Sequence, residues 1–269
     1  MDDAQRNSDR HWPTPQRSWA MRMGWHDLLF MHWPVPVDAI RALIPKDLEI
    51  DTFGGRAWIG IVPFRMSDVA PKFIPGIPWL SAFPELNVRT YVTVEDKPGV
   101  WFFSLDATNP VAVRVARTFF HLPYMDAKIA ITESEQGYDY QSRRTHRVEP
   151  PAEFDVSYRP TSEQFFAKPG TLEYWLTARY CLYAADRTGT VLRGDIDHSP
   201  WPLQQAECTI RKNTMATAAD VELPNEPPHL LFVQDISVVA WTNEQVCTAS
   251  ESIEALGLET ARVTSRQRS

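Results

Sequence analysis

The sequence predicts a single α+β domain built on an antiparallel β-barrel, with a few short helices on its outside. Many short segments of the 269-residue chain alternate apolar and polar residues, which is typical of half-buried strands. The chain has 22 prolines against 11 glycines, and so many prolines favour short, stiff segments over long helices. Helical periodicity is confined to a few stretches, so the strands are expected to close on themselves and leave the helices outside.

The first elements are a strand, a helix and a hairpin. A bulky apolar run over residues 25–33 predicts the strand. Pro36 suits an early helical position and Pro45 ends the pattern, so a compact helix is expected over 37–45. Two β-rich runs around a Gly-Gly pair then predict a hairpin over 48–62.

A second helix is expected from Pro110, in the middle of the strands. Val111, Val115 and Phe119 recur every four positions, and Pro123 ends the pattern. The other expected elements are strands over 85–95, 100–107, 126–133, 138–148, 153–160, 190–198, 202–212 and 230–241, and a helix over 173–186 that turns into a strand near Arg179.

Composition divides the chain into three segments. Residues 1–18 lack periodicity, which predicts a flexible N-terminal tail, because so polar a stretch cannot bury enough surface to offset the entropy of ordering. No linker or repeat interrupts residues 19–247, which are expected to fold as one domain. Residues 248–269 are expected to form a short helix and a frayed tail.

Charge and cysteine content exclude several classes of protein. The net charge of −7 and the pI of about 5.5 oppose a nucleic-acid surface, which needs a basic footprint. The three cysteines have no metal-binding spacing, and their odd number completes no disulfide framework. The sequence has neither a secretory signal nor a run of about 18 apolar residues. We therefore expect a cytoplasmic protein with no nucleic-acid or membrane partner; the sequence does not indicate its oligomeric state.

Several long segments match the pattern of a known family. In order they are HDLLFMHWPVPVDAIRALIPKDLEIDTFGGRAWIGIVPF, FPELNVRTYV, WFFSLDA, LPYMDAKIAI, TLEYWLTARYCLY, RGDIDHSPWPLQ and VVAW, within roughly residues 20–245. On these segments the chain resembles the YqjF-like family of uncharacterised bacterial proteins. That family looks like a distant relative of acetoacetate decarboxylase, with VDAIRALIPKDLEID as the clearest shared stretch. The resemblance implies the decarboxylase fold, a β-barrel-like cone with an internal apolar cavity.

The residues of the decarboxylase reaction are not matched. The resemblance implies a lysine Schiff base whose pKa is lowered by an adjacent lysine and by an apolar pocket. No two lysines are adjacent in this chain, and the comparable stretch supplies Arg114, Arg117 and His121 instead. Arginine stays protonated and forms no Schiff base. The known mechanism is therefore not carried over, since a shared fold does not imply shared chemistry.

Glu85, Asn87 and Arg89 form the best candidate site. They lie two residues apart on one face of a predicted strand whose other face is apolar. In a small barrel one strand face points inward, and this row would then occupy about 14 Å of strand. Arg89 offers a carboxylate bidentate geometry, with Asn87 as a second ligand-binding residue and Glu85 as a proton-transfer residue. The alternatives are an outward, solvated face or a purely structural ion pair.

Asp106 and Lys128 are two further candidates for catalysis. An inward Asp106 would act as a general base or orient Arg89; otherwise it caps the turn that follows its strand. A desolvated Lys128 would become a nucleophile through a lowered pKa; otherwise it is a surface lysine near Asp126.

The segment RGDIDHSPWP supplies the last candidates. His198 is an acid–base candidate because the ordinary pKa of histidine lies near neutrality, and the alternative is a buried histidine bonded to a backbone carbonyl. Trp201 is a candidate ligand-binding residue, although most aromatic residues of the chain are expected in the core. His26 and His32 are roughly 20 Å apart along a straight strand, so one metal ion cannot take both.

Two classes of function are compatible with these residues. In the first, an internal cavity handles a small oxo acid or related carbonyl metabolite, with or without chemistry. In the second, the barrel binds an apolar metabolite or serves as a scaffold for a partner. The sequence has no glycine-rich phosphate loop, dinucleotide-binding fingerprint or serine nucleophile motif, so we expect no cofactor and no metal. The expected partner is a small-molecule ligand.

Overall fold

The computed structural model describes residues 9–73, 76, 81–186 and 188–246. Its strands are β1 (Met21–Val35), β2 (Glu49–Ile50), β3 (Ala57–Pro71), β4 (Phe83–Val94), β5 (Lys97–Ala107), β6 (Tyr124–Ser134), β7 (Gly137–Arg144), β8 (Glu153–Pro160), β9 (Cys181–Ala185), β10 (Val191–His198), β11 (Gln204–Asn213), β12 (His229–Ala240) and β13 (Glu244–Gln245). The helices are α1 (Val37–Arg41), α2 (Pro110–Val115), a π-helical turn η1 (Ala116–Phe120), α3 (Leu172–Thr177) and a 3₁₀ turn η2 (Thr217–Ala219).

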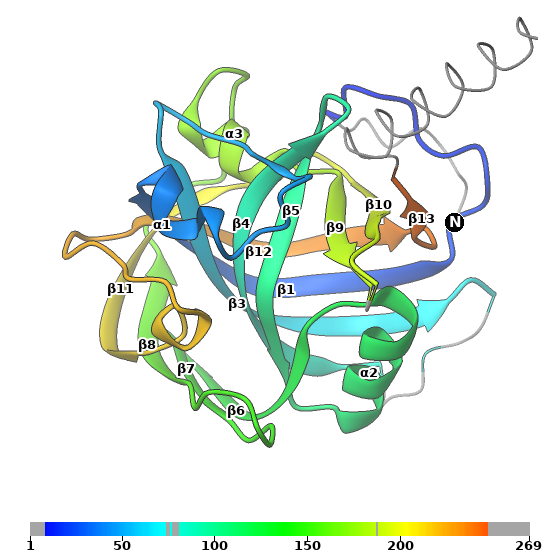
Figure 1. Cartoon of the computed structure of the whole chain (residues 1–269). Coiled ribbons are helices and arrows are strands. Elements are labelled where there is room, and N and C mark those ends of the chain that lie inside the picture. The colour runs from blue at the N-terminus through cyan, green and yellow to red at the C-terminus, as the bar shows by residue number, and fades with distance from the viewer. Residues whose placement is uncertain (1–8, 74–75, 77–80, 187, 247–269) are drawn as a thin grey trace, which may run out of the picture.

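Nine strands of this described part close into a barrel (Figure 1). Their order is β1-β3-β4-β5-β6-β7-β8-β11-β12, and β12 pairs back with β1. The predicted barrel is therefore confirmed, but it is mixed and not purely antiparallel. Strand β5 runs parallel to β6 and to β9. The helical segments α2 and η1 connect β5 to β6 and carry the chain back to the starting end, whereas β9 follows β8 through α3.

Strands β9 and β10 close a second, smaller ring. Strand β9 pairs with β5, and β10 pairs with both β9 and β12. Strands β12, β1, β3, β4 and β5 are therefore a wall shared by two apolar cores. On β1, Leu29 and Met31 belong to the first core, whereas Leu28 and Phe30 belong to the second. Such strands are buried on both faces, so apolar–polar alternation does not mark a solvent-facing side here.

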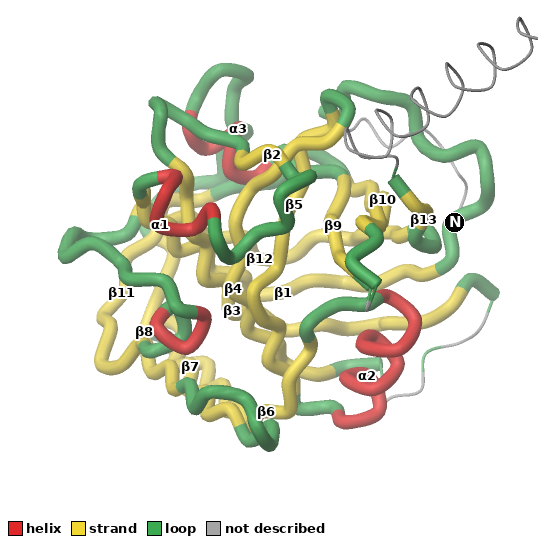
Figure 2. Tube along the Cα trace, in the orientation of Figure 1, coloured by secondary structure: helices red, strands yellow, loops and turns green. Residues whose placement is uncertain are grey.

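The helices are short and lie at the periphery (Figure 2). The helix predicted from Pro110 is present, capped by the Asn109 side chain, and it continues as the π-turn η1 before Pro123. The predicted transition from helix to strand near Arg179 is also observed, between α3 and β9.

The hairpin predicted over 48–62 is wrong. Gly54 and Gly55 do form a tight turn with positive φ angles, but the residues that flank it, Phe53 and Arg56, form only an isolated β-bridge and not a pair of strands. Strand β2 pairs with β4 instead, because β3 is already flanked by β1 and β4.

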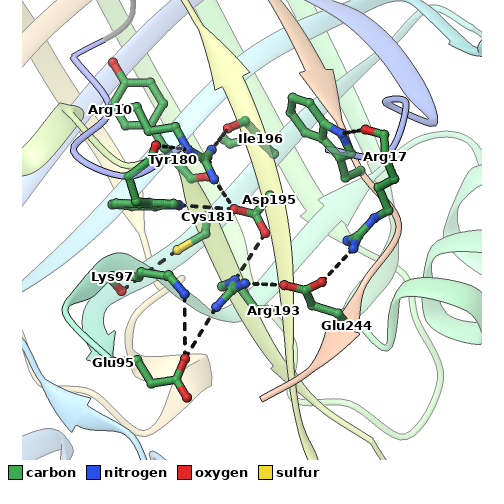
Figure 3. A network of polar contacts seen from close by, with 12 residues as sticks. Arg10, Arg17, Glu95, Lys97, Tyr180, Cys181, Arg193, Asp195, Ile196 and Glu244 are labelled. Atoms are coloured by element: carbon green, nitrogen blue, oxygen red, sulfur yellow. Dashed lines mark hydrogen bonds and ion pairs between the residues drawn. The ribbon is translucent and has the colours of Figure 1, made fainter. Parts of the chain in front are cut away.

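Residues 9–18, which the sequence assigned to a flexible tail, lie against β9 and β10 (Figure 3). Arg10 is buried; it donates hydrogen bonds to the carbonyl oxygens of Tyr180 at 3.1 Å and Ile196 at 2.8 Å, and it pairs with Asp195. Farther along, the Trp241 indole donates to the carbonyl of Arg17 at 2.7 Å. The polar composition of residues 9–18 wrongly predicted a flexible tail, because a polar residue can also be buried when it is fully hydrogen-bonded. Arginine can donate to several buried acceptors at once. The tails predicted for residues 1–8 and 248–269 lie outside the described residues.

No helix within the described ranges is long and apolar enough to cross a lipid bilayer.

Candidate functional site

The polar row of β4 faces the interior of the second ring. Leu86 and Val88 belong to the first core, so the alternate residues point to the opposite side of the shared wall. Glu85, Asn87 and Arg89 expose only 2%, 5% and 9% of their surface. The expectation of an inward row therefore agrees with the structure.

Arg89 is held over a glycine. His32 on β1, Gly60 on β3 and Arg89 on β4 are paired in one row across the shared wall. A Cβ atom on Gly60 would lie 3.0 Å from the His32 ring and 3.2 Å from the Arg89 side chain. Gly60 therefore leaves room for both side chains to lie over the same strand.

The Arg89 guanidinium has few polar partners. Its Nη2 donates a long hydrogen bond of 3.4 Å to the Tyr91 hydroxyl, and its carbon lies 5.1 Å from the centre of the Phe30 ring. Its Nε has no hydrogen-bond partner, and no carboxylate among the described residues forms an ion pair with it. Arg89 is therefore a buried cation without a counter-ion in the described chain.

His32 and Tyr91 form the wall beside Arg89. The His32 Nε2 lies 2.6 Å from the Tyr91 hydroxyl, and the His32 Nδ1 has no partner. Burial, assisted by the positive charge of Arg89, lowers the pKa of His32 well below its ordinary value. The ring is therefore neutral at physiological pH and does not repel Arg89.

A second guanidinium, that of Arg179, also lies near the Tyr91 ring. It stacks 4.7 Å from the Tyr91 ring centre and 4.4 Å from that of Trp175. Unlike Arg89, it has a carboxylate partner, since its Nη1 donates to Asp51 at 2.5 Å. The charges of Arg179 and Asp51 cancel, which leaves the positive charge of Arg89 uncompensated.

Glu85 occupies the other end of the row. The Tyr124 hydroxyl donates to its carboxylate at 2.7 Å, and the Asn87 amide is its second side-chain hydrogen-bond partner. Burial raises the pKa of Glu85 to about 7, against the opposing effect of these two hydrogen bonds. A carboxyl group with such a pKa can give or take a proton near neutral pH.

Asp106 does not join this row. It lies on the opposite face of the shared wall, paired with Arg144 at 2.8 Å, and Arg144 also donates to Ser104. Burial raises the pKa of Asp106, and Arg144 opposes that shift. The expectation that Asp106 orients Arg89 is wrong, because its carboxylate is already bound by a different arginine.

Lys128 does not join it either. It is exposed on β6, opposite Arg143 of β7, and it lines an open surface cavity of about 420 Å³. A second cavity of about 420 Å³ lies beneath residues 12–17, and neither cavity is lined by Arg89. The desolvated nucleophile considered for Lys128 is therefore wrong, and the alternative of a surface lysine is correct.

His198 and Trp201 are packed in the second core. The His198 Nδ1 lies 2.7 Å from the carbonyl oxygen of Ser199, and the ring stacks on Tyr180. The Trp201 indole donates to the carbonyl of Thr177 at 2.8 Å and packs edge-on against Phe30. His198 thus has the carbonyl-bonded arrangement that was the alternative to acid–base chemistry, and Trp201 contacts Phe30, which lies beside Arg89.

Several residues of the site escaped the sequence analysis, among them Tyr91, His32 and Arg179. Tyr91 continues the alternation of the polar row by one step, so its position was readable from the pattern. His32 and Arg179 were not readable in this way, because they reach the row through strand register and through the second ring.

The fold is that of solved acetoacetate decarboxylase-like proteins. The enduracididine biosynthesis enzyme MppR, complexed with pyruvate, matches with a TM-score of 0.57 at 11% identity, over 86% of this chain and 91% of that one. An acetoacetate decarboxylase-like enzyme from Sphingomonas wittichii RW1 matches with a TM-score of 0.56 at 11% identity, over 89% and 98% of the two chains. Acetoacetate decarboxylase from Legionella pneumophila gives 0.56 at 11% identity, over 93% and 98%.

Sequence relatives are closer. The family model DUF2071, described as an uncharacterized conserved protein, matches residues 22–237. A Bacillus subtilis (strain 168) protein described as "Uncharacterized protein YqjF" is 46% identical over 227 residues, which cover 84% of this chain and 93% of the relative. With matches of this extent, the chain belongs to the YqjF-like DUF2071 family, on an acetoacetate decarboxylase-like barrel.

Proposed function

We propose that this protein binds a short carboxylic acid, an oxo acid or a relative with another oxygen group near the carboxylate, in the interior of the second ring. The carboxylate binds Arg89. The observation that carries the proposal is a guanidinium that is 9% exposed and has no carboxylate partner among the described residues.

The energetics favour a ligand anion at this position. Burying a charge without a partner costs several kcal/mol even after relaxation, on the order of 3–5 kcal/mol where a partner has been removed. A ligand carboxylate would offset this cost through charge-assisted hydrogen bonds to Nε and the terminal nitrogens. Phe30 and Tyr91 supply an apolar wall for a short carbon chain.

The relatives support an oxo acid within this class. One protein with this fold is described as complexed with pyruvate, a 2-oxo acid, and others are described as acetoacetate decarboxylases. The Schiff-base step of a lysine pair is not part of the proposal, because no two lysines are adjacent and Lys128 is exposed. Glu85 is the group that would exchange a proton with a bound ligand, by virtue of its raised pKa.

Calorimetric titration with pyruvate and with freshly prepared acetoacetate tests the proposal. The wild-type protein is expected to bind at least one of them, and Arg89→Met should weaken that binding at least about a hundredfold, since a buried charged hydrogen-bonded pair contributes about 3 kcal/mol or more. Arg114→Met is the matched control, because it removes an exposed arginine that pairs with Asp126. Equal affinity of wild type and Arg89→Met for the acid that binds would contradict the proposal, as would failure of both acids and of the corresponding hydroxy acid to bind.

A further inference from the structure

We infer that the site selects acids that carry a hydroxyl group near the carboxylate, short hydroxy acids in preference to the corresponding oxo acids. The inference rests on the proposed function and adds to it the identity of the second oxygen group. It is carried by the Oδ1 atom of Asn87, a buried acceptor without a hydrogen-bond partner.

The orientation of the Asn87 amide follows from its neighbour. Its hydrogen bond to Glu85 stabilises the ionised carboxylate, as does the one from Tyr124, so the amide is the donor in that bond. Only the amide nitrogen of asparagine can donate. The nitrogen therefore faces Glu85, and the Oδ1 is left without a partner in a side chain that is 5% exposed.

An acceptor and a donor are thus unsatisfied on adjacent positions of one strand face. The Asn87 Oδ1 needs a hydrogen-bond donor, and the Arg89 Nε needs an acceptor. Alternate residues of a strand are separated by about 6.6 Å. A short hydroxy acid bridges such a gap, because two hydrogen bonds of about 2.8 Å add to the distance between its own oxygens.

An oxo acid satisfies only half of this pair. Its carboxylate accepts from Arg89, but its carbonyl oxygen would face the Asn87 Oδ1, and two acceptors cannot share a hydrogen bond. A site built to bond a ligand hydroxyl rejects the analogue that lacks it by factors up to about 10⁴–10⁵. We expect a preference of at least about tenfold, since one neutral hydrogen bond is involved.

The experiment compares acetoacetate with both enantiomers of 3-hydroxybutyrate, which differ from it only in the oxygen group, by calorimetry on the wild-type protein. One enantiomer is expected to bind at least about ten times more tightly than acetoacetate. This comparison needs no variant and so does not depend on the folding of one.

The variant Asn87→Leu then tests whether the preference for the hydroxy acid depends on the Asn87 side chain. The variant keeps the size of the side chain and removes the acceptor, so the advantage of the hydroxy acid should fall to about one while the dependence on Arg89 persists. Gln141→Leu, which removes an amide from the exposed face of β7, is the control that should keep the preference.

The outcomes separate the two proposals. Arg89-dependent binding without a preference for 3-hydroxybutyrate, or with one that survives in Asn87→Leu, overturns the hydroxy-acid inference and leaves the proposed function standing. Failure of all these acids to bind overturns both.

Discussion

Two buried arginines on opposite faces of the shared wall differ in one respect. Arg144 is bound by the carboxylate of Asp106, whereas Arg89 lies over the rings of Phe30 and Tyr91 and donates one long hydrogen bond to the Tyr91 hydroxyl. Burial alone does not distinguish a structural arginine from a ligand-binding one; the partner does. The difference makes the two residues suited to a paired test of stability.

Substitution by methionine should have opposite effects at these two positions. Arg144→Met leaves the Asp106 carboxylate buried without a cation, so the free energy of unfolding should fall by about 3–5 kcal/mol. Arg89→Met removes an unpaired buried charge, so the ligand-free protein should be equally stable or more stable. Urea unfolding of both variants measures the difference. A loss of similar size at Arg89 would identify it as a structural residue.

The pKa of Glu85 makes stability depend on pH in a defined direction. The pKa of Glu85 is about 7 in the folded protein, whereas its ordinary value is 4.5. The contribution of the Glu85 proton to the free energy of unfolding is therefore complete below pH 4.5 and is lost as the pH rises through 7. His32 acts in the opposite sense, because its lowered pKa costs stability as pH falls below 6.5. The wild-type curve alone is therefore a sum of opposing effects.

Subtracting the Glu85→Gln curve isolates the glutamate. The variant stays neutral at all pH values, so its stability relative to wild type should rise between pH 4.5 and 7, by on the order of 3 kcal/mol at about 1.4 kcal/mol per pKa unit. Chemical denaturation across this range measures the difference. Glu163→Gln, at an exposed position, should give a flat difference; a flat result for Glu85→Gln as well would mean that the carboxyl titrates normally.

Among the elements, the N-terminal segment of residues 9–18 is a folded part of the molecule. It covers the outer face of β9 and β10, where Asp195 receives both Arg10 and Arg193 (Figure 3). The bonds of Arg10 to two buried carbonyls tie the segment to the second ring.

Removing the Arg10 side chain should therefore destabilise the whole domain. Arg10→Met removes the Arg10 hydrogen bond to the Ile196 carbonyl and one of two hydrogen bonds to the Tyr180 carbonyl, which still accepts from the Ile196 N–H. A buried group left unsatisfied costs about 1–3 kcal/mol. Arg17→Met, in the same segment, breaks the ion pair between Arg17 and Glu244, whose side chains are 39% and 36% exposed. This substitution should lower the free energy of unfolding by less than about 1 kcal/mol. Thermal unfolding compares the two. Equal, negligible effects would show that the segment contributes nothing to stability.

The sequence predicts elements better than it predicts their partners. Alternation located β4 and its polar row, and Pro110 located the start of α2. The hairpin at Gly54-Gly55 failed because local turn chemistry does not decide which strand β2 joins. For the same reason, His32 was not placed beside Arg89, since that contact depends on register across a third strand.

At the scale of the whole molecule, the barrel is mixed because β6 and β9 run parallel to β5. This barrel has the fold of the decarboxylases but not their lysine pair, since no two lysines of the chain are adjacent. A lysine without a neighbouring cation or burial has a pKa of about 10.4 and is almost wholly protonated at neutral pH. Such a lysine does not form an imine efficiently.

Incubation with acetoacetate and borohydride should therefore leave the intact mass of the protein unchanged. An acetoacetate decarboxylase that has the lysine pair provides the positive control, and mass spectrometry provides the measurement. A stoichiometric adduct on Lys128 that disappears in Lys128→Ala would show that Schiff-base chemistry occurs in this chain after all.

The pairing of β1 with β12 also determines when the molecule can be completed. Met21 lies opposite Ala240, so the first strand of the barrel pairs with its last strand. Contacts between such distant residues slow folding, because a long loop must close before the pairing stabilises anything. During synthesis on the ribosome, β1 cannot pair with β12 until β12 has left the exit tunnel. Until then the nascent chain exposes an unpaired strand edge, which is the state most open to aggregation and to capture by chaperones.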